Sequence, residues 1–222
     1  MQDYFSRQIM LWGKETQDEL SKKSILIVGS GGLGCSVALA LSGAGLKRVD
    51  IVDFDKVEIH NIHRQVLFNK CDCGEFKAKI VSKKIKQRCE NLESSYFLEP
   101  FNEFVKMNST NYDLIVDATD NLKVRFEINK YAKDNNIAWV YGSVEEFNGQ
   151  VCLFKEGDFT IFANKDLEVK GISAPMVMQV ASFEANLALR YLANLKVKSD
   201  IFYYLYYNNE GEFELKKFKL PI

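Results

Sequence analysis

A glycine-rich segment near the N-terminus has the spacing of a phosphate-binding loop. The segment Gly29-Ser30-Gly31-Gly32-Leu33-Gly34 satisfies G-x-G-x-x-G and follows an apolar run, Ser24 to Val28. Mostly small apolar residues continue to Gly45, so the motif lies between a predicted strand and a predicted helix, as it must. The first glycine permits a tight turn, the second lets the backbone approach a phosphate, and the third allows close helix–strand contact. Amide groups at the helix N-terminus then face the anion.

A carboxylate stands where a ribose hydroxyl would be bound. Asp53 follows Gly34 by 19 residues, at the end of the second predicted strand. In dinucleotide-binding folds, an acidic residue at this position accepts a hydrogen bond from the ribose. Taken alone, the pattern indicates a nucleotide, with NAD or FAD as the usual ligand. The alternative is a tight strand–helix turn that binds nothing.

Four polar residues further along the chain favour a nucleoside triphosphate over a dinucleotide. Asn61 and Arg64 follow the second strand, Lys77 opens a later helix, and Asp120 follows a fourth strand. Arg64 can hold phosphate oxygens through two hydrogen bonds, and Lys77 supplies a point charge. Asp120 can ligate Mg²⁺, which prefers one or two carboxylates together with phosphate oxygens. The chain also lacks the Tyr-x-x-x-Lys pair of short-chain dehydrogenases.

The elements that must position these residues alternate along the first two thirds of the chain. Short apolar runs alternate with helical patterns up to Tyr141, which predicts a parallel, doubly wound sheet. Ligands of such sheets lie beyond the carboxyl ends of the strands, so the candidate residues should converge there. The expected strands are 24–28, 49–54, 96–98, 112–117 and 137–141, and the expected helices are 33–45, 76–88 and 121–133.

The pattern changes after residue 141. Asn148-Gly149 is a strong hairpin signal within 145–154, and a long helix is expected over 173–195. Two further strands are expected over 201–220. The fold class is therefore α/β, a Rossmann-like, mainly parallel sheet extended by antiparallel C-terminal strands. We expect one domain over 1–222, made of an N-terminal helical segment (1–20), a nucleotide-binding core (24–142) and an antiparallel extension with a long helix (143–222).

Composition excludes several classes of protein. Of 222 residues, 29 are Lys or Arg and 30 are Asp or Glu, so a net charge of −1 gives no support for nucleic-acid binding. No apolar run reaches the length of a membrane span, and the first ten residues lack a signal-peptide pattern. The five cysteines do not cluster as a disulfide scaffold would, so a cytoplasmic protein is expected.

These motifs, in this order, resemble those of the ThiF/MoeB family, relatives of the ubiquitin-activating enzymes. Their spacing matches over nearly the whole chain. The matching segments are Tyr4-Phe5-Ser6-Arg7-Gln8-Ile9, the glycine loop with Cys35, Asp53-Phe54-Asp55-Lys56-Val57, Asn61-Ile62-His63-Arg64-Gln65, Gly74-Glu75-Phe76-Lys77, Asp117-Ala118-Thr119-Asp120-Asn121, Tyr141-Gly142-Ser143, Gly149-Gln150-Val151 and Ala174-Pro175.

The resemblance implies an enzyme that uses ATP and Mg²⁺. Such enzymes adenylate the C-terminal glycine carboxylate of a small ubiquitin-like protein and release pyrophosphate. The resemblance implies that Asp120 organises Mg²⁺ and that Arg7 reaches the γ-phosphate from the partner subunit of a homodimer. Arg7, Arg64, Lys77 and Asp120 would be catalytic, and Gly29, Gly31, Gly32, Gly34, Asp53, Asn61, Arg64, Lys77 and Asn121 would bind the nucleotide.

Most of these residues also have a purely structural interpretation. Arg7 could pair with a surface acid, Lys77 could be one solvated lysine among several, and Asp120 could only cap a helix. Asp55 could be a second acid on the phosphate side or a turn residue. His60 and His63 are interpreted as loop residues rather than catalytic bases.

The chain departs from the family in its cysteines. Many members bind zinc through two C-x-x-C pairs, but the equivalent stretch, Phe159 to Asn164, has none, so no structural zinc is expected. Cys152 and Cys35 are expected to be buried packing residues, and the acyl-adenylate is expected to pass to a separate sulfur donor. Residues 164–172 are expected to form a mobile crossover loop over the partner's C-terminal tail.

The resulting hypothesis is adenylation of a Gly-Gly-ended sulfur carrier in thiamine (thiazole) biosynthesis. The same chemistry in molybdopterin biosynthesis, or on a short peptide, is the alternative. A tRNA-modifying relative is disfavoured by the charge balance. A non-catalytic binding module would be indicated by the loss of Arg64, Lys77 or Asp120, and all three are present. A nicotinamide-dependent oxidoreductase is the remaining alternative, and a comparison of NADH and Mg-ATP binding would separate it.

Overall fold

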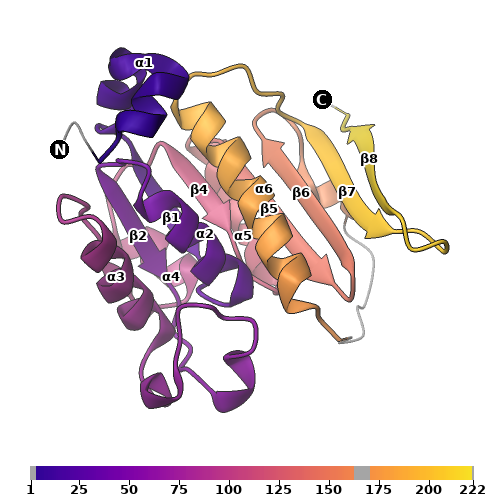
Figure 1. The fold of residues 1–222 in the computed structure, drawn as a ribbon, viewed down its shortest axis with the longest axis horizontal. Helices are drawn as coiled ribbons and strands as arrows, with labels where there is room; N and C mark the ends of the chain where they lie inside the picture. Colours follow the sequence, from indigo (N-terminus) through magenta and orange to yellow (C-terminus); the bar gives the residue numbers. More distant parts are fainter. Residues whose placement is uncertain (1–3, 163–170, 222) are drawn as a thin grey trace.

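A single mixed sheet organises the molecule in this computed structural model, which describes residues 4–162 and 171–221. The strand order is β3-β2-β1-β4-β5-β6-β7-β8 (Figure 1). Strands β1 to β5 run parallel, and each of the remaining three is antiparallel to the strand before it. The strands are β1 Ser24–Val28, β2 Arg48–Val52, β3 Tyr96–Phe97, β4 Leu114–Asp117, β5 Trp139–Glu145, β6 Asn148–Phe154, β7 Ile201–Tyr207 and β8 Phe213–Lys219.

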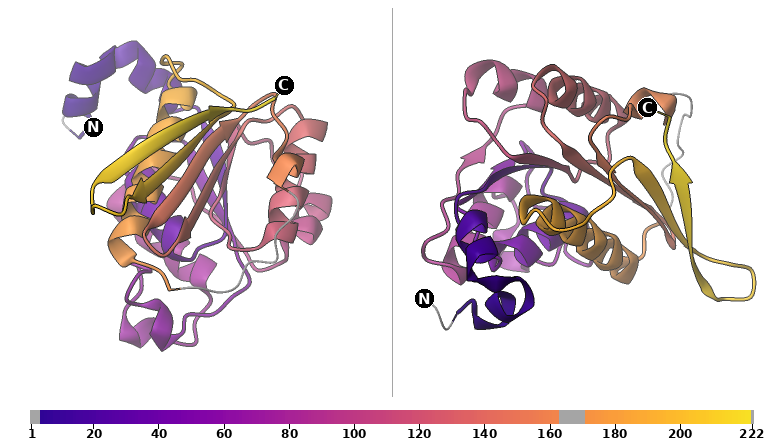
Figure 2. Two further views of the ribbon diagram at one scale, coloured as in Figure 1. Left: turned by 90° about the vertical axis from the view of Figure 1, so that its right-hand side faces the viewer. Right: turned by 90° about the horizontal axis from the view of Figure 1, so that it is seen from above.

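Helices cover both faces of this sheet (Figure 2). The larger core lies between the sheet and α2, α3 and α6, and the smaller core lies between the opposite face and α4 and α5. Among the described residues, no helix combines the length and the apolarity needed to cross a bilayer. The helices are α1 Ser6–Leu20, α2 Gly32–Ser42, α3 Lys77–Arg88, α4 Phe101–Met107, α5 Leu122–Asp134 and α6 Ala174–Leu192, with short 3₁₀ turns at Ile59–Asn61, Lys70–Asp72 and Phe159–Phe162.

The predicted fold class is confirmed, and one turn was placed wrongly. The β5–β6 hairpin turns at Glu146 and Phe147, two residues before the Asn148-Gly149 signal. Glu146 itself adopts the left-handed conformation (φ +54°). Gly149 lies within the strand because α6 passes close to it: a Cβ there would come 2.3 Å from Cγ2 of Val180. The glycine therefore serves helix–sheet contact rather than the turn.

Two other elements differ from the sequence prediction. Helix α4 was not expected; its seven residues follow Pro100, and only Phe101 and Phe104 are buried. The expected N-terminal helical segment is present as α1, but it has a kink at Gly13, where φ is +84°. Residues 164–170 of the expected crossover loop lie outside the described residues.

A buried carboxyl group lies against the sheet without a hydrogen-bond partner. Glu184 of α6 is fully buried, and neither carboxylate oxygen has a partner within the described residues. A Cβ on Gly142 of β5 would come 2.2 Å from this carboxyl group, so only glycine leaves room for it. Burial raises the pKa of Glu184 well above its usual value, and the nearby charge of Asp117 adds to the effect.

Replacing Glu184 by Gln should therefore stabilise the protein as pH rises. Because the folded-state pKa is raised, the folded chain keeps a proton that the unfolded chain releases above the ordinary carboxyl pKa. The free energies of unfolding of wild type and Glu184→Gln should nearly coincide near that ordinary pKa. Above it, the variant should gain about 1.4 kcal/mol per pH unit until the folded-state pKa is reached. Urea unfolding at several pH values measures this.

The control is Glu90→Gln, since Glu90 is exposed. Its stability relative to wild type should not depend on pH. An equal, pH-independent effect of both substitutions would contradict a protonated Glu184.

Candidate nucleotide-binding site

The glycine loop is compressed between β1, β4 and its own helix. Gly29 has φ +89°, and a Cβ there would come 2.7 Å from the carbonyl oxygen of Ala118. A Cβ on Gly34 would come 2.1 Å from the carbonyl oxygen of Gly29, so the first turn of α2 packs directly on the end of β1. Gly31 has only the Gln65 side chain nearby, at 3.6 Å. Two glycines thus serve backbone packing, and Gly31 leaves the loop open to a ligand.

Asp53 is bound to the glycine loop at the end of β2. Its Oδ2 accepts hydrogen bonds from the backbone N–H and the hydroxyl of Ser30, at 2.7 and 2.8 Å, and Oδ1 accepts one from the Asp55 N–H at 2.7 Å. Burial raises the pKa of Asp53, and these hydrogen bonds oppose that shift. Ser30 was not among the predicted site residues. Its position inside the motif was the only available signal.

The loop that carries Asn61 and Arg64 lies against the glycine loop. A Cβ on Gly32 would come 3.4 Å from the Arg64 carbonyl oxygen and 3.6 Å from its Cγ. Asn61 is buried, and its carbonyl oxygen accepts hydrogen bonds from the N–H groups of Arg64 and Gln65. Arg64 is partly exposed, and its guanidinium contacts the ring of His63 at 2.9 Å. Asn61 therefore fixes the backbone that presents Arg64.

Lys77 differs from the other lysines of α3. It is 8% exposed, and its Nζ lies 2.9 Å from Oδ2 of Asp55. The Lys77 N–H also donates to the Asp55 carbonyl oxygen. The interpretation of Lys77 as one solvated lysine among several is therefore wrong. Asp55, which sequence reasoning left open, is the acid that holds this cation beside Asp53.

Asp120 is exposed at the N-terminal end of α5. It makes no hydrogen bond or ion pair with the described part of the chain. Asn121 caps the helix, since its Oδ1 accepts from the N–H groups of Lys123 and Val124 at 2.9 and 3.2 Å. The interpretation of Asp120 as only a helix cap is therefore wrong, and its carboxylate is available to a ligand.

Arg125 positions the segment that carries Asp120, and sequence reasoning missed it. Its Nε donates to Oδ2 of Asp117 at 3.2 Å, and Nη2 donates to the carbonyl oxygens of Thr119 and Gly142 at 2.6 and 3.3 Å. Both Arg125 and Asp117 are buried. The guanidinium thus joins β4, the loop after it and β5. Its place one helical turn after Asn121 was the available signal.

Arg7 lies apart from this cluster. Gln8 and Gln17 of α1 donate to the Ala44 carbonyl oxygen, just beyond the C-terminal end of α2. The glycine loop lies at the other end of α2, whose 11 residues span about 16 Å. Figure 1 shows α1 at the opposite end of the molecule from the loops that follow β2. Arg7 is exposed and has no ion pair within the described residues.

The two cysteines considered as nucleophiles are both buried. Cys35 and Cys152 are inaccessible in α2 and β6. Burial raises the pKa of Cys35 to about 12 and also raises the pKa of Cys152. Both are therefore packing residues, as predicted, because a protonated thiol is a weak nucleophile.

The geometry defines a class of protein. A Rossmann-like sheet presents open loop amides, the Asp53 carboxylate, two cations and an exposed carboxylate around the carboxyl ends of its strands, which suits an anionic nucleotide with a metal ion. A family model described as the ThiF family matches residues 5–221. The chain belongs to the ThiF family.

Curated relatives of the chain are longer. The sulfur carrier protein adenylyltransferase of Thermus thermophilus is 38% identical over 161 residues, covering 68% of this chain and 57% of that protein. A probable molybdopterin-synthase adenylyltransferase of Gracilaria tenuistipitata is 29% identical over 222 residues, covering 94% and 61%. The adenylyltransferase and sulfurtransferase MOCS3 of Aedes aegypti is 35% identical, covering 68% and 35%. The chain thus spans about a third to three fifths of these relatives.

Solved structures share the fold at low sequence identity. Escherichia coli MccB aligns with a TM-score of 0.84 at 18% identity, covering all of this chain and 71% of that one. MccB in complex with ATP aligns with a TM-score of 0.82 at 19% identity, covering 96% and 70%. The structure of PaaA aligns with a TM-score of 0.83 at 21% identity, covering 99% and 73%. These likenesses support the fold.

Alanine substitutions at Gly34 and Gly31 should have different effects on stability, because Gly34 is packed against the backbone and Gly31 is not. Gly34→Ala should destabilise the protein by about 3 kcal/mol or more, because its Cβ would overlap the backbone of Gly29. Gly31→Ala, whose Cβ meets no atom closer than 3.6 Å, should change the free energy of unfolding by less than about 1 kcal/mol. Denaturant unfolding measures both. Equal destabilisation by the two substitutions would contradict the close packing of Gly34 against Gly29.

Proposed function

We propose that the chain adenylates the C-terminal glycine carboxylate of a small, ubiquitin-like sulfur-carrier protein and releases pyrophosphate. The observation that carries the proposal is the grouping of Asp53, Arg64, Lys77 and Asp120 around the glycine loop. Family membership and the names of the curated relatives support it. A carboxylate and a triphosphate repel each other, so positioning and charge neutralisation must supply most of the rate enhancement.

Each residue has a role that follows from its position. Asp53, already bound to Ser30, accepts a ribose hydroxyl. The amide groups at the start of α2 face the phosphates, with Gly31 leaving room for them. Arg64 and Lys77 neutralise phosphate oxygens from two sides, and the Nδ2 group of Asn61 adds a donor. Asn121 holds α5 in place beside the nucleotide.

Mg²⁺ fits the donor set, because Asp120 is an exposed carboxylate without a protein partner in the described structure. Asp120 would hold the ion together with phosphate oxygens. The bound ion would withdraw charge from the phosphate chain. Among the described residues, no three His, Cys, Asp or Glu side chains gather as a metal site. Our expectation of no structural zinc therefore rests on the sequence.

A second copy of the chain would complete the site. Arg7 is held far from its own glycine loop, so we propose that it reaches the γ-phosphate of the partner subunit in a homodimer. The buried Cys35 and Cys152 favour transfer of the acyl-adenylate to a separate sulfur donor. We favour the thiazole pathway of thiamine synthesis; a molybdopterin carrier or a short peptide is the alternative substrate.

ATP–pyrophosphate exchange tests the proposal directly. The purified chain should catalyse exchange with Mg²⁺ and one Gly-Gly-ended carrier, because reversible adenylation returns labelled pyrophosphate to ATP. The thiazole and molybdopterin carriers are compared side by side, and a carrier without its last glycine is the control. Binding of Mg-ATP without exchange on either carrier would contradict the sulfur-carrier assignment. Binding of NADH instead of Mg-ATP would contradict adenylation altogether.

Asp120→Ala should abolish exchange without unfolding the protein. Asp120 is exposed and bonds to nothing in the described chain, so stability should be unchanged. Loss of one such electrostatic contact lowers the rate by about 10²–10³, or ~3–4 kcal/mol. Asp134→Ala, which removes an exposed carboxylate at the other end of α5, is the matched control and should retain full activity. Exchange near the wild-type rate in Asp120→Ala would remove Asp120 from the site.

A further inference from the structure

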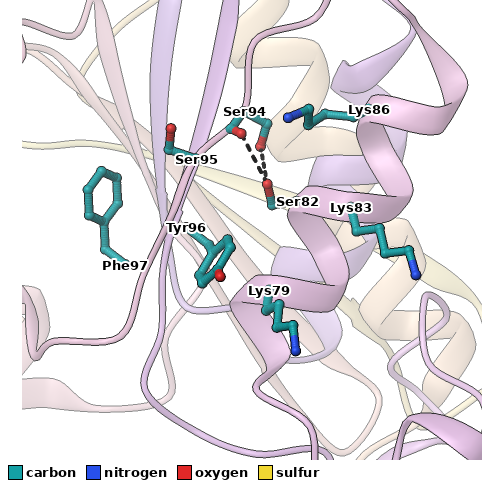
Figure 3. A pocket seen from close by; sticks show the side chains of 8 residues that line it. All are labelled: Lys79, Ser82, Lys83, Lys86, Ser94, Ser95, Tyr96 and Phe97. Carbon is teal, nitrogen blue, oxygen red and sulfur yellow. Dashed lines mark hydrogen bonds between the residues drawn. The ribbon is translucent and has the colours of Figure 1, made fainter.

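A groove lies along the outer edge of the sheet, next to β3. It encloses about 680 Å³ between α3 and the segment Ser94 to Phe97 (Figure 3). Lys79, Lys83 and Lys86 line it from the helix side, at positions i, i+4 and i+7 of one helix face. Nothing in the proposed adenylation reaction uses these three lysines.

The strand in this groove presents unpaired backbone groups. Strand β3 is the last strand at its end of the sheet. The carbonyl oxygens of Ser95 and Phe97 accept hydrogen bonds from the N–H groups of Ile51 in β2 and of Asp53, directly after it. Since successive residues of a strand turn their backbone groups to opposite sides, the N–H and C=O of Tyr96 face outward, into the groove.

The neighbouring outward-facing carbonyl is already occupied. Ser82 of α3 donates its hydroxyl to the Ser94 carbonyl oxygen at 3.3 Å, and Ser94 donates its own hydroxyl to Ser82 at 2.9 Å (Figure 3). These two bonds fix the distance between α3 and the strand. The groove is therefore a built feature, with Tyr96 as the open edge position.

Two of the three lysines in the groove make no direct bond to the described part of the protein. Lys83 and Lys86 form no hydrogen bond or ion pair with the described chain, whereas Lys79 pairs with Glu75 at 2.7 Å. Figure 3 shows the Lys86 ammonium extending toward Ser94, with Lys79 near the Tyr96 ring. The Tyr96 side chain is 44% exposed. An occupant would meet ammonium groups, an aromatic ring and a strand edge together.

We propose that this groove binds an acidic, extended segment of a partner protein, which adds as a strand beside β3. Its backbone would pair with the outward N–H and C=O of Tyr96, and its acidic side chains would meet the three lysines. The exposed face of Tyr96 would pack against an apolar residue between the acids. The residues that line it include none of the proposed nucleotide-binding residues, so it goes beyond the proposed activity.

The strand edge favours a peptide over a nucleic acid. A polyanion needs only the ammonium groups, and the chain as a whole is not basic, with a net charge of −1. A peptide uses both features, because only a backbone with N–H and C=O groups can pair with Tyr96. The three lysines then select an acidic sequence and set its position along α3.

Fluorescence anisotropy tests the proposal with a labelled octapeptide of alternating Glu and Val as the probe, at low ionic strength. The double substitution Lys83→Glu with Lys86→Glu should weaken binding about tenfold or more, because two attractions become repulsions. Lys196→Glu with Lys198→Glu changes the same charge on another exposed segment and should leave binding unchanged. Both variants should keep the unfolding midpoint of the wild type.

Strand pairing is tested by changing the octapeptide instead of the protein, so that the folding of the protein is not affected. Methylation of the four central backbone nitrogens of the octapeptide keeps its charge and removes its donors, and it should weaken binding at least about fivefold. Equal binding of both peptides would overturn strand addition. Tighter binding of polyphosphate or single-stranded DNA than of the octapeptide would overturn the peptide assignment. Failure of the octapeptide to bind would overturn the proposal. The lysines would then serve only to keep other strands from pairing with this edge of the sheet.

Discussion

The buried ion pair between Arg125 and Asp117 is the interaction on which the site most depends. Two charges removed from water cost free energy unless each finds further polar partners. Arg125 has them in the carbonyl oxygens of Thr119 and Gly142, and Asp117 accepts from the N–H and hydroxyl of Thr119. The same bonds fix the loop after β4 and the middle of β5. The loop that carries Asp120 is therefore held by a satisfied interior network.

Lys77 and Asp53, beside the glycine loop, are also held by other residues of the chain. Lys77 is buried, and Asp55 holds it at 2.9 Å, while Asp53 is tied to the glycine loop through Ser30. Asp55 thus fixes the Lys77 ammonium group beside Asp53. If a triphosphate binds here as proposed, Lys77 and Asp53 are already fixed by these bonds, so little reorganisation of the two side chains opposes binding.

Sequence predicted the elements whose signals are local, and it missed contacts between distant segments. The glycine loop, Asp53 and Asn121 can be recognised from their spacing within one strand–loop–helix unit. Glu184 and Gly142 are 42 residues apart in the sequence, so nothing local shows that one makes room for the other. Gly149 was misread as a turn residue for the same reason, since its role depends on Val180 of α6. The short helix α4 was missed because it buries only two side chains, Phe101 and Phe104, which is too few to show a helical pattern in the sequence.

The position of α1 limits what Arg7 can reach within its own chain. Gln8 and Gln17 bind the Ala44 carbonyl oxygen, and a side chain on Gly45 would overlap Gln17 and Phe5, so α1 packs closely on the far end of α2. A flexible arginine reaches only part of the length of α2. Arg7 therefore cannot serve its own glycine loop without detaching the helix from these contacts. If Arg7 contacts a phosphate at all, the contact must form between two copies of the chain.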